Sequence, residues 1–524
     1  MNGAQALIRA LVDAGVDVCF ANPGTSEMHF VAALDAVPEM RGVLALYEGV
    51  ATGAADGYAR MADRPAATLL HLGPGLANGL SNLHNARRAG TPVVNVVGDH
   101  ATYHKRFDAP LESDIDAIAG AVSGWVRRSD SAAQVASDTA AAVAAAFGPP
   151  AQVATLILPA DVSWSEAGEP AAPATAAGQS DTTGQVSAEA GEAMAAAAKA
   201  LRSGEPCVLL IGGDATREAG LRSASRIAIA TDAKLLCETF PTRLERGVGL
   251  PAVERLGYLA EMATYQLGEA KHLILAGARS PVTFFAYPDK PSDLVPQGCE
   301  VHVLAEPSYA NAALATLADE VAAGTDAPLA PSGHIELPTG ELTAETSAIV
   351  VGALLPEAAV VVDEANTSSL FLPTATASAP RHDWLTLTGG SIGYGLPAAT
   401  GAALACPDRP ILCLEADGSA MYTISALWTQ ARENLDITTI IYHNSAYAIL
   451  RMELQRVGAV ESGDRARALL DLSGPTLDFV ALATGMGVPA SRATTAEEFS
   501  DQLARAIAEP GPHLIEAVVP SIVP

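Results

Sequence analysis

Residues that could bind a cation and a phosphate group stand at the ends of two expected strands. Asp417 follows an apolar run of strand length, and Asn444 follows a β-branched run 27 residues further along. Because parallel strands end at the same edge of a sheet, where ligands bind, these two side chains are expected to converge. Mg²⁺ prefers oxygen ligands and shares them with phosphate groups. Gly418 and Ser419 open a helix expected over 420–434, whose free N–H groups would bind the same phosphates.

Two further titratable side chains follow strands in the first part of the chain. Glu48 comes after the apolar run 43–47 and before a helix rich in small residues, so its simplest role is to interact with the positive end of that helix. His71 also follows an apolar run, where most histidines are hydrogen-bonded core residues. The next residues, Gly73-Pro74-Gly75, are expected to form a backbone turn.

Two of these patterns resemble the signature of the thiamine-diphosphate-dependent enzymes. Asp-Gly-Ser is a common turn when it stands alone. Asp417-Gly418 followed by Asn444 resembles the family's motif for Mg²⁺ and diphosphate. Glu48 followed by the helix 54–60 resembles the motif of the family's first domain. The resemblance covers nearly the whole chain, because the two motifs stand near its opposite ends.

The resemblance implies a role for each of these residues. Mg²⁺ would be bound by the side chains of Asp417 and Asn444 and by the backbone carbonyl of Ala446. Ala416 departs from the family pattern, which has a glycine there. Glu48 would form a hydrogen bond with the pyrimidine ring of the cofactor. His71 corresponds to a histidine that acts on the substrate in the benzoylformate decarboxylase branch.

The remaining cofactor contacts are expected in the last part of the chain. Hydroxyl and amide side chains that follow the expected strand 360–362 suit a diphosphate group. In the family, a carbonyl at the position of Gly390 accepts a hydrogen bond from the cofactor, and an apolar side chain at Ile392 wedges between its rings. The cofactor-binding residues are therefore expected to be Asn366, Thr367, Ser368, Gly390, Ile392, Gly418 and Ser419.

Composition limits the function classes. The chain has 524 residues, is 49% hydrophobic, and contains no apolar stretch that could span a bilayer. A net charge of −28 argues against a nucleic-acid partner, which requires a basic face. Six cysteines without metal-binding spacing and the lack of a leader segment indicate a soluble cytoplasmic protein.

Alternating strands and helices predict an α/β fold with three doubly wound parallel-sheet domains. We expect a pyrimidine-binding domain at 1–165, a low-complexity linker at 166–191 and a central domain at 192–323. A second linker at 324–343 would lead to a diphosphate-binding domain at 344–524, in which 450–467 is a charged, irregular lid. Gly212-Gly213 after a central strand is weak evidence for a nucleotide site, and FAD is not expected.

The resemblance implies catalysis on a 2-oxo acid. Loss of carbon dioxide leaves a carbanion that needs an electron sink, which a thiazolium provides. We therefore expect a decarboxylase and carboligase similar to acetolactate synthase, with pyruvate as the donor. A simple decarboxylase similar to benzoylformate decarboxylase is an alternative, although its second histidine has no counterpart in 284–288. Acetolactate synthases usually have glutamine in place of Asp99, and most have a FAD site.

Three further expectations concern partners and rival functions. Because Glu48 and Asp417 must meet on one cofactor, the resemblance implies a homodimer or tetramer with active sites at the dimer interface. A catalytically silent relative that binds thiamine diphosphate is a second alternative. A nucleotide-dependent oxidoreductase that uses the central domain is a third.

Overall fold

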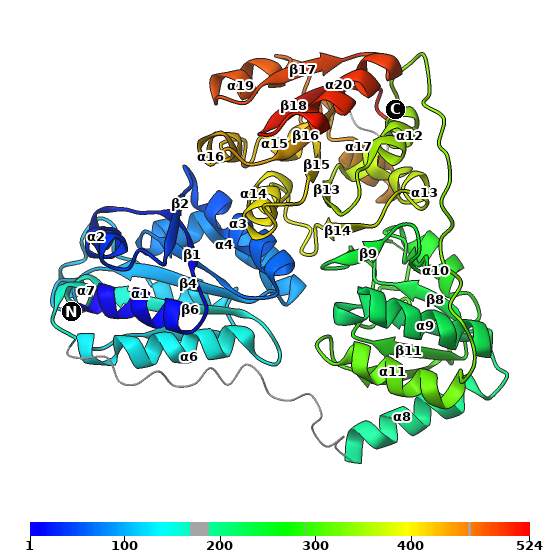
Figure 1. Cartoon of the computed structure of the whole chain (residues 1–524), viewed down its shortest axis with the longest axis horizontal. Helices are drawn as coiled ribbons and strands as arrows, with labels where there is room; N and C mark the ends of the chain where they lie inside the picture. The colour runs from blue at the N-terminus through cyan, green and yellow to red at the C-terminus, as the bar shows by residue number, and fades with distance from the viewer. Residues whose placement is uncertain (168–187, 289, 460–462, 524) are drawn as a thin grey trace.

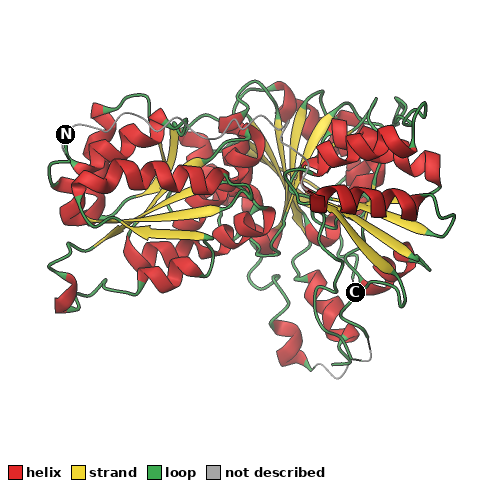
Figure 2. Cartoon of the chain, turned by 90° about the horizontal axis from the view of Figure 1, so that it is seen from below, coloured by secondary structure: helices red, strands yellow, loops and turns green. Residues whose placement is uncertain are grey.

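The structure, a computed structural model, describes residues 1–167, 188–288, 290–459 and 463–523, and it consists of three α/β units (Figure 1). The first unit, blue to cyan, lies beside the last unit, yellow to red, and the middle unit, green, lies below the last one. The strands lie between layers of helices (Figure 2). The predicted fold class is confirmed: the chain has three doubly wound sheets that are mainly parallel.

The first unit has a six-stranded sheet in the order β2-β1-β3-β4-β6-β5, with all strands parallel. Its strands β3, β4 and β6 are buried along their whole length and mostly apolar, as expected for a sheet covered on both faces. Its elements are α1 (Gly3–Asp13), β1 (Val18–Asn22), α2 (Met28–Ala33), β2 (Arg41–Leu44), α3 (Glu48–Ala62), β3 (Ala66–Leu70), α4 (Leu72–Ala89), β4 (Val93–Asp99), α5 (Ile115–Gly120), β5 (Trp125–Arg128), α6 (Val135–Phe147), β6 (Val153–Pro159) and α7 (Ala160–Trp164).

The middle unit has a five-stranded parallel sheet in the order β10-β8-β7-β11-β12. Its apolar core continues into the last unit, so the two pack as one body. Its elements are α8 (Ala188–Leu201), β7 (Cys207–Ile211), α9 (Glu218–Thr231), β8 (Lys234–Cys237), β10 (Glu254–Arg255), α10 (Ala260–Leu267), β11 (His272–Ala276), β12 (Glu300–Ala305) and α11 (Ala310–Val321).

The last unit has a seven-stranded sheet in the order β17-β18-β16-β15-β13-β14-β9. Its edge strand β9 (Leu244–Arg246) comes from the middle region and pairs antiparallel with β14. The other elements are α12 (Ala344–Leu354), β13 (Ala359–Glu364), α13 (Leu372–Ala375), β14 (His382–Thr386), α14 (Gly395–Ala405), β15 (Ile411–Ala416), α15 (Asp417–Ala420), α16 (Ala426–Arg432), β16 (Ile437–His443), α17 (Ala448–Arg456), α18 (Asp464–Ala468), α19 (Phe479–Gly485), β17 (Ala490–Ala493), α20 (Ala496–Ala508) and β18 (His513–Val518).

The first and last units are joined by close packing of α3 on α14. Gly57 and Gly401 make this approach possible, because a Cβ at either position would overlap a carbonyl oxygen of the facing helix, at Ala398 and Ala54 respectively. Apolar side chains of both units form one continuous cluster around these helices. The small residues in the run 54–60 are therefore required for packing.

Arg60 is a second link between these two units. Its fully buried guanidinium pairs with Asp56 at 2.6 Å. It also donates to the Thr386 carbonyl at 2.8 Å and to the Thr388 hydroxyl at 3.0 Å, and it lies 4.7 Å from the ring centre of Tyr394. A buried cation is tolerated only when its donors are satisfied, and here partners from both units satisfy them.

Two local predictions are wrong. Gly73-Pro74-Gly75 is not a separate turn but part of the first turn of α4, where proline is tolerated, and Leu72 adopts the positive φ, at +50°. The helix expected over 420–434 is divided into α15 and α16. The β-branched Thr423 lies between them, and its hydroxyl donates to the Gly393 carbonyl at 3.1 Å.

Two predicted irregular segments contain helices. The helix α8 begins at Ala188, inside the expected linker 166–191, while residues 168–187 of that linker lie outside the described residues. The segment 450–467 is mostly helical, in α17 and α18, apart from 460–462, which are not described. The segment 324–343 contains no helix and only an isolated bridge at Glu341.

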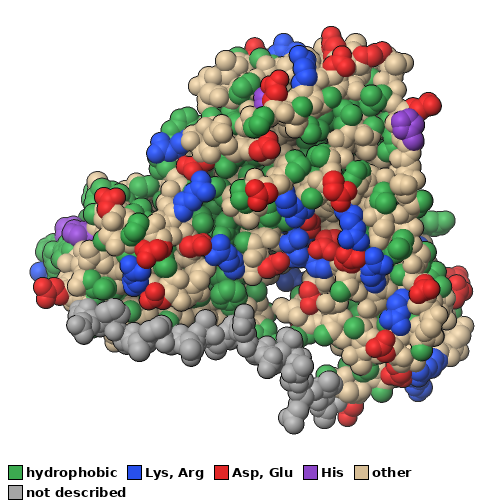
Figure 3. Space-filling view, viewed as in Figure 1, with side chains coloured by type: hydrophobic (Ala, Val, Ile, Leu, Met, Phe, Trp, Pro, Cys, Tyr) green, Lys and Arg blue, Asp and Glu red, His purple; other side chains and the backbone are tan. Residues whose placement is uncertain are grey.

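One face of the molecule can be followed for the distribution of charge. On the face seen in Figure 3, acidic and basic side chains are interspersed over all three units. None of the described helices combines the length and apolar character needed to cross a bilayer. All six cysteines are free thiols.

Candidate active site

The residues expected to bind Mg²⁺ meet at the carboxyl edge of the last sheet. Asp417 follows β15, and its carboxylate accepts backbone N–H bonds from Gly418 (2.8 Å), Asn444 (3.0 Å) and Ser445 (2.7 Å). The side-chain oxygen of Asn444 accepts from the Ala446 N–H at 3.0 Å. The structure therefore brings Asp417, Asn444 and Ala446 into one turn between two neighbouring strands.

The chemistry of this turn fits a hard cation. Asp417 is 1% exposed, and burial raises the pKa of its carboxyl group although three backbone N–H groups oppose the shift. Within the described part of the chain, no lysine or arginine forms an ion pair with it. A carboxylate, an amide and a backbone carbonyl are the oxygen ligands that Mg²⁺ prefers.

The candidate diphosphate-binding residues come from two adjacent strands. Asn366, Thr367 and Ser368 lie in a short 3-10 helix after β13, and Ser419 lies in α15 after β15. The Asn366 amide donates to the Ser419 hydroxyl at 3.0 Å, so the segments that follow the two strands are in direct contact. A Cβ at Gly418 would overlap the Tyr447 ring, which explains the glycine.

Gly390 and Ile392 lie on the loop from β14 to α14. The side chain of Asn85 holds this loop by donating to the Ser391 carbonyl at 2.8 Å and accepting from its N–H at 3.2 Å. Gly390 has a φ of +72°, and a Cβ there would lie 2.9 Å from the Phe284 ring. Phe284 therefore brings the middle unit to the edge of this loop.

Glu364 organises the same loop and was not identified from the sequence. Its buried carboxyl group accepts the N–H bonds of Gly393 (2.8 Å), Tyr394 (2.7 Å) and Gly395 (2.5 Å). Burial raises the pKa of Glu364, and burial together with the Glu364 charge raises that of the neighbouring Glu415. The detectable signal was an acidic residue directly after an apolar strand.

Glu48 and His71 lie next to each other at the edge of the first sheet. Glu48 is the first residue of α3, is 8% exposed, and accepts a hydrogen bond from the Asn78 amide at 3.0 Å. A Cβ at Gly75 would lie 3.2 Å from the Glu48 carboxylate and 3.3 Å from the Cβ of His71. The two candidate catalytic residues therefore flank one glycine.

Glu27 is a further residue that sequence reasoning missed. Its buried carboxylate lies 2.8 Å from Nδ1 of His71, and it also accepts the hydroxyl of Ser26 (2.9 Å) and the N–H of Gly24 (2.8 Å). The signal in the sequence was weak, because Glu27 stands in a polar turn like many others. Asp99, in contrast, is occupied by ion pairs with Lys105 and Arg128.

The candidate residues thus form two groups on two sheets. In one chain they are connected through Asn82, whose amide donates to the Gly49 carbonyl at 2.8 Å and to the Gly393 carbonyl at 3.1 Å. The first group includes Glu48 at the start of α3. The second group includes Ile392 and the Asp417 turn.

The Gly212-Gly213 turn of the middle unit is explained by packing. A Cβ at Gly213 would overlap Pro307, and one at Gly212 would lie 2.8 Å from the Gly277 carbonyl oxygen. Gly213 has a φ of +56°, which favours glycine. The glycines are therefore required by the chain's own backbone.

Comparison with known families supports a cofactor site built from the two ends of the chain. Residues 1–119 match the model described as thiamine pyrophosphate enzyme, N-terminal TPP binding domain. Residues 368–517 match the corresponding C-terminal TPP binding domain. The first range contains Glu48 and His71, and the second contains Asp417 and Asn444.

Relatives extend this similarity over the full length. A Mycobacterium tuberculosis protein named "Putative acetolactate synthase large subunit IlvX" is 69% identical, with 100% of both chains covered. Benzoylformate decarboxylase of Pseudomonas aeruginosa is 32% identical, with 97% of both covered. The structure of a thiamine diphosphate-dependent 4-hydroxybenzoylformate decarboxylase from Rhodococcus jostii superimposes with a TM-score of 0.85 at 25% identity, covering 99% of each chain.

Proposed function

Because this chain belongs to the thiamine pyrophosphate enzyme family, we propose that it decarboxylates a 2-oxo acid and ligates the product to a second carbonyl compound, as acetolactate synthase does. Pyruvate is the proposed donor. The full-length similarity to a protein named as an acetolactate synthase large subunit supports this reaction. The cofactors would be thiamine diphosphate and Mg²⁺.

Different residues of the chain would bind different parts of this cofactor. Asp417, Asn444 and the Ala446 carbonyl would hold Mg²⁺, and the hydroxyl and amide groups that follow β13 and β15 would hold the diphosphate. Bound thiamine diphosphate supplies a thiazolium that accepts the electron pair left by decarboxylation. Gly390 and Ile392 would orient the rings, and Glu48 would exchange a proton with the pyrimidine.

The arrangement around Gly75 carries the proposal. Glu48 and His71 flank this glycine, so the residue proposed to contact the cofactor lies beside a histidine that can move a proton on the substrate. Glu27 fixes Nδ1 of His71 at 2.8 Å, which leaves Nε2 for the substrate. The role of His71 would be to hold and transfer a proton, while Gly75 leaves room for the reacting group.

We also propose that each active site uses two protomers, with Glu48 from one and Asp417 from its partner. Exposed apolar side chains stand beside both groups: Leu46 is 49% exposed, Met421 38% and Tyr422 56%. Such side chains are typical of surfaces that another subunit covers. The six free thiols are consistent with a reducing compartment, and we place the protein in the cytoplasm.

A simple decarboxylase is the second candidate. The Pseudomonas and Rhodococcus relatives are both named as decarboxylases of benzoylformate or its 4-hydroxy form. The Glu27–His71 pair would also serve protonation of the product. Phe284, however, occupies the middle-unit position beside Gly390, and the segment 284–288 offers no second histidine.

The experiment is a panel of 2-oxo acids, including pyruvate and benzoylformate, with thiamine diphosphate and Mg²⁺. Carbon dioxide and ligated products are measured together, with Glu48→Gln and Asp417→Ala as controls. We expect pyruvate to give both products, and the controls to lose about 100-fold or more of this rate. Release of carbon dioxide from benzoylformate without ligation would instead establish the second candidate.

Two other outcomes would reject both candidates. Bound thiamine diphosphate without turnover of any 2-oxo acid would indicate a catalytically silent relative. Bound NAD or FAD, seen by absorbance, together with no thiamine requirement would indicate an oxidoreductase.

A further inference from the structure

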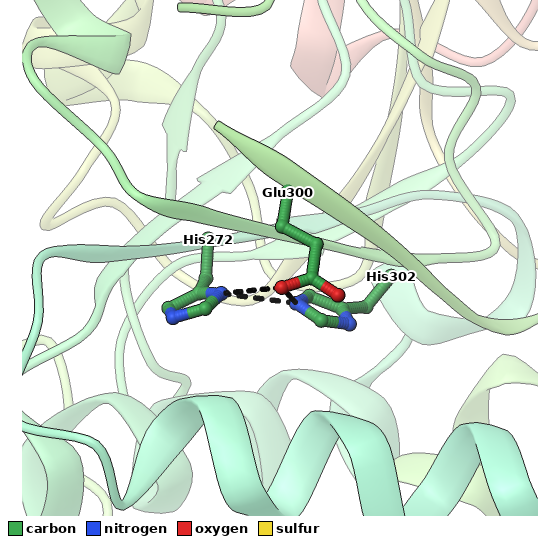
Figure 4. A group of neighbouring side chains, drawn as sticks. All are labelled: His272, Glu300 and His302. Carbon is green, nitrogen blue, oxygen red and sulfur yellow. Dashed lines mark hydrogen bonds and ion pairs between the residues drawn. The ribbon is translucent and has the colours of Figure 1, made fainter. Parts of the chain in front are cut away.

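Two histidines and a glutamate meet on the sheet of the middle unit, which holds none of the residues predicted for the active site. His272 begins β11, and Glu300 and His302 are the first and third residues of its parallel neighbour β12 (Figure 4). His302 is on the same face of β12 as Leu304, because side chains alternate along a strand. Leu304 belongs to the core cluster that includes residues of α8, so this face is the one that α8 covers.

The three ligand atoms already have the spacing of a metal site. Nδ1 of His272 lies 3.0 Å from Nε2 of His302, and each nitrogen lies 3.9 Å from Oε2 of Glu300. In the plane of these three atoms, the point equidistant from all of them is about 2.1 Å from each, which is the length of zinc bonds to imidazole nitrogen and carboxylate oxygen. Figure 4 shows the two rings facing each other with the carboxylate beside them.

The other nitrogen of His272 has the partner that a metal-bound histidine requires. Nε2 lies 3.1 Å from Oε2 of Glu205, a contact in which the ring donates and the carboxylate accepts. This hydrogen bond makes Nδ1 of His272 the unprotonated nitrogen, and such carboxylate–histidine pairs orient imidazole ligands at metal sites.

We propose that His272, His302 and Glu300 bind one divalent transition-metal ion, with Zn²⁺ as the preferred ion and water in the remaining position. Imidazole nitrogen suits zinc and its neighbours in the periodic table but not Mg²⁺, so this site is distinct from the oxygen site at Asp417. The ion joins the edge strand β12 to β11 and so stabilises the open side of the middle sheet. Without an ion, the same residues form only a hydrogen-bonded chain from Glu205 through His272 to His302.

The test uses the full, untagged chain stripped with a chelator and then dialysed against Zn²⁺ in excess Mg²⁺, which occupies the oxygen site. Bound zinc per chain is counted by elemental analysis. His302→Gln and Glu300→Gln remove ligands, and His334→Gln, at an exposed position, is the matched control. Glu300 is 70% exposed at its side chain, so its variant is expected to fold even if His302→Gln does not.

We expect wild type and His334→Gln to bind one more zinc ion per chain than His302→Gln, and Glu300→Gln to bind zinc at least 10-fold more weakly. Zinc should also raise the melting temperature of wild type and His334→Gln but not that of His302→Gln. Equal zinc contents in all four proteins would overturn the proposal. So would a wild type that binds no additional zinc at micromolar concentration. Neither result would affect the proposed thiamine chemistry.

Discussion

His71 has one ring nitrogen engaged and the other free. Nδ1 lies 2.8 Å from Glu27 and 3.2 Å from the Ser26 hydroxyl, and Nε2 has no hydrogen-bond partner among the described residues. The carboxylate therefore fixes which nitrogen is left for a ligand, an arrangement that carboxylates also give to catalytic histidines. If His71 has the proposed role, Glu27 would act through it as a positioning residue.

We predict that His71→Ala lowers turnover of the active 2-oxo acid by about 100-fold or more, because general acid–base catalysis contributes 10²–10⁴-fold. The affinity for thiamine diphosphate should stay within about threefold, since cofactor binding depends on other residues. Steady-state kinetics and a cofactor titration measure the two effects. His29→Ala, at an exposed histidine of the same unit, is the control.

Unchanged turnover in His71→Ala would show that this histidine has only a structural role. A parallel loss of cofactor affinity would mean that it supports the cofactor and not the substrate. The turnover of Glu27→Gln should lie between that of wild type and that of His71→Ala, because the ring loses the carboxylate that orients it.

For single residues, the sequence predicted the placement of those that belong to a motif with a defined spacing. Asp417, Asn444 and Ala446 converge as expected, because the ends of adjacent parallel strands meet at one edge. It missed Glu27 and Glu364. Their roles depend on which backbone N–H groups and which ring the fold brings to them, and no local pattern records such contacts.

Strands were predicted better than helices. The runs that precede Asp417 and Asn444 are the strands β15 and β16, and the strand expected at 360–362 lies within β13, because buried parallel strands depend on hydrophobic side chains that the sequence displays. The break between α15 and α16 depends on a contact between Thr423 and Gly393, 30 residues away. A prediction from local propensity cannot include it.

The strand β14 carries a titratable group that makes stability depend on pH. Burial lowers the pKa of His382 from 6.5 to about 4, and its Nδ1 donates to the Pro380 carbonyl at 2.7 Å. Below pH 6.5, His382 is protonated in the unfolded chain but stays neutral in the folded chain until the pH approaches 4. Between pH 7.5 and pH 5 this histidine should therefore lower the free energy of unfolding by about 2 kcal/mol.

Denaturant unfolding of His382→Asn at both pH values tests this prediction. Asparagine can keep the bond to Pro380, so the variant should lose stability at pH 7.5 through the smaller side chain but should show a smaller loss on acidification. His334→Asn, at an exposed position, should keep the wild-type pH dependence. An unchanged dependence in His382→Asn would contradict the assignment.

On the scale of the whole molecule, three sheets were predictable and their connections were not. Alternating strand and helix patterns indicated three units, but nothing local indicated that β9 leaves the middle region to pair with β14. The small residues 54–60 were identified through resemblance, and the structure shows that they let α3 approach α14. How two chains associate also depends on surfaces that a single sequence does not reveal.

The proposed active site combines Glu48 of one protomer and Asp417 of its partner on the same cofactor. A heterodimer of one Glu48→Gln chain and one Asp417→Ala chain, purified through two different tags, tests it without any substrate. Each homodimer should be defective: the first binds thiamine diphosphate but exchanges its thiazolium proton slowly, and the second does not bind it.

If the active sites are shared between chains, the heterodimer contains one site with both substitutions and one site with neither. We predict one bound thiamine diphosphate per dimer, with deuterium exchange at the thiazolium carbon at the wild-type rate per bound cofactor. If each chain instead forms its own site, the single bound cofactor will be bound by the chain that carries Glu48→Gln. Its exchange will then be as slow as in the Glu48→Gln homodimer, which would contradict the account.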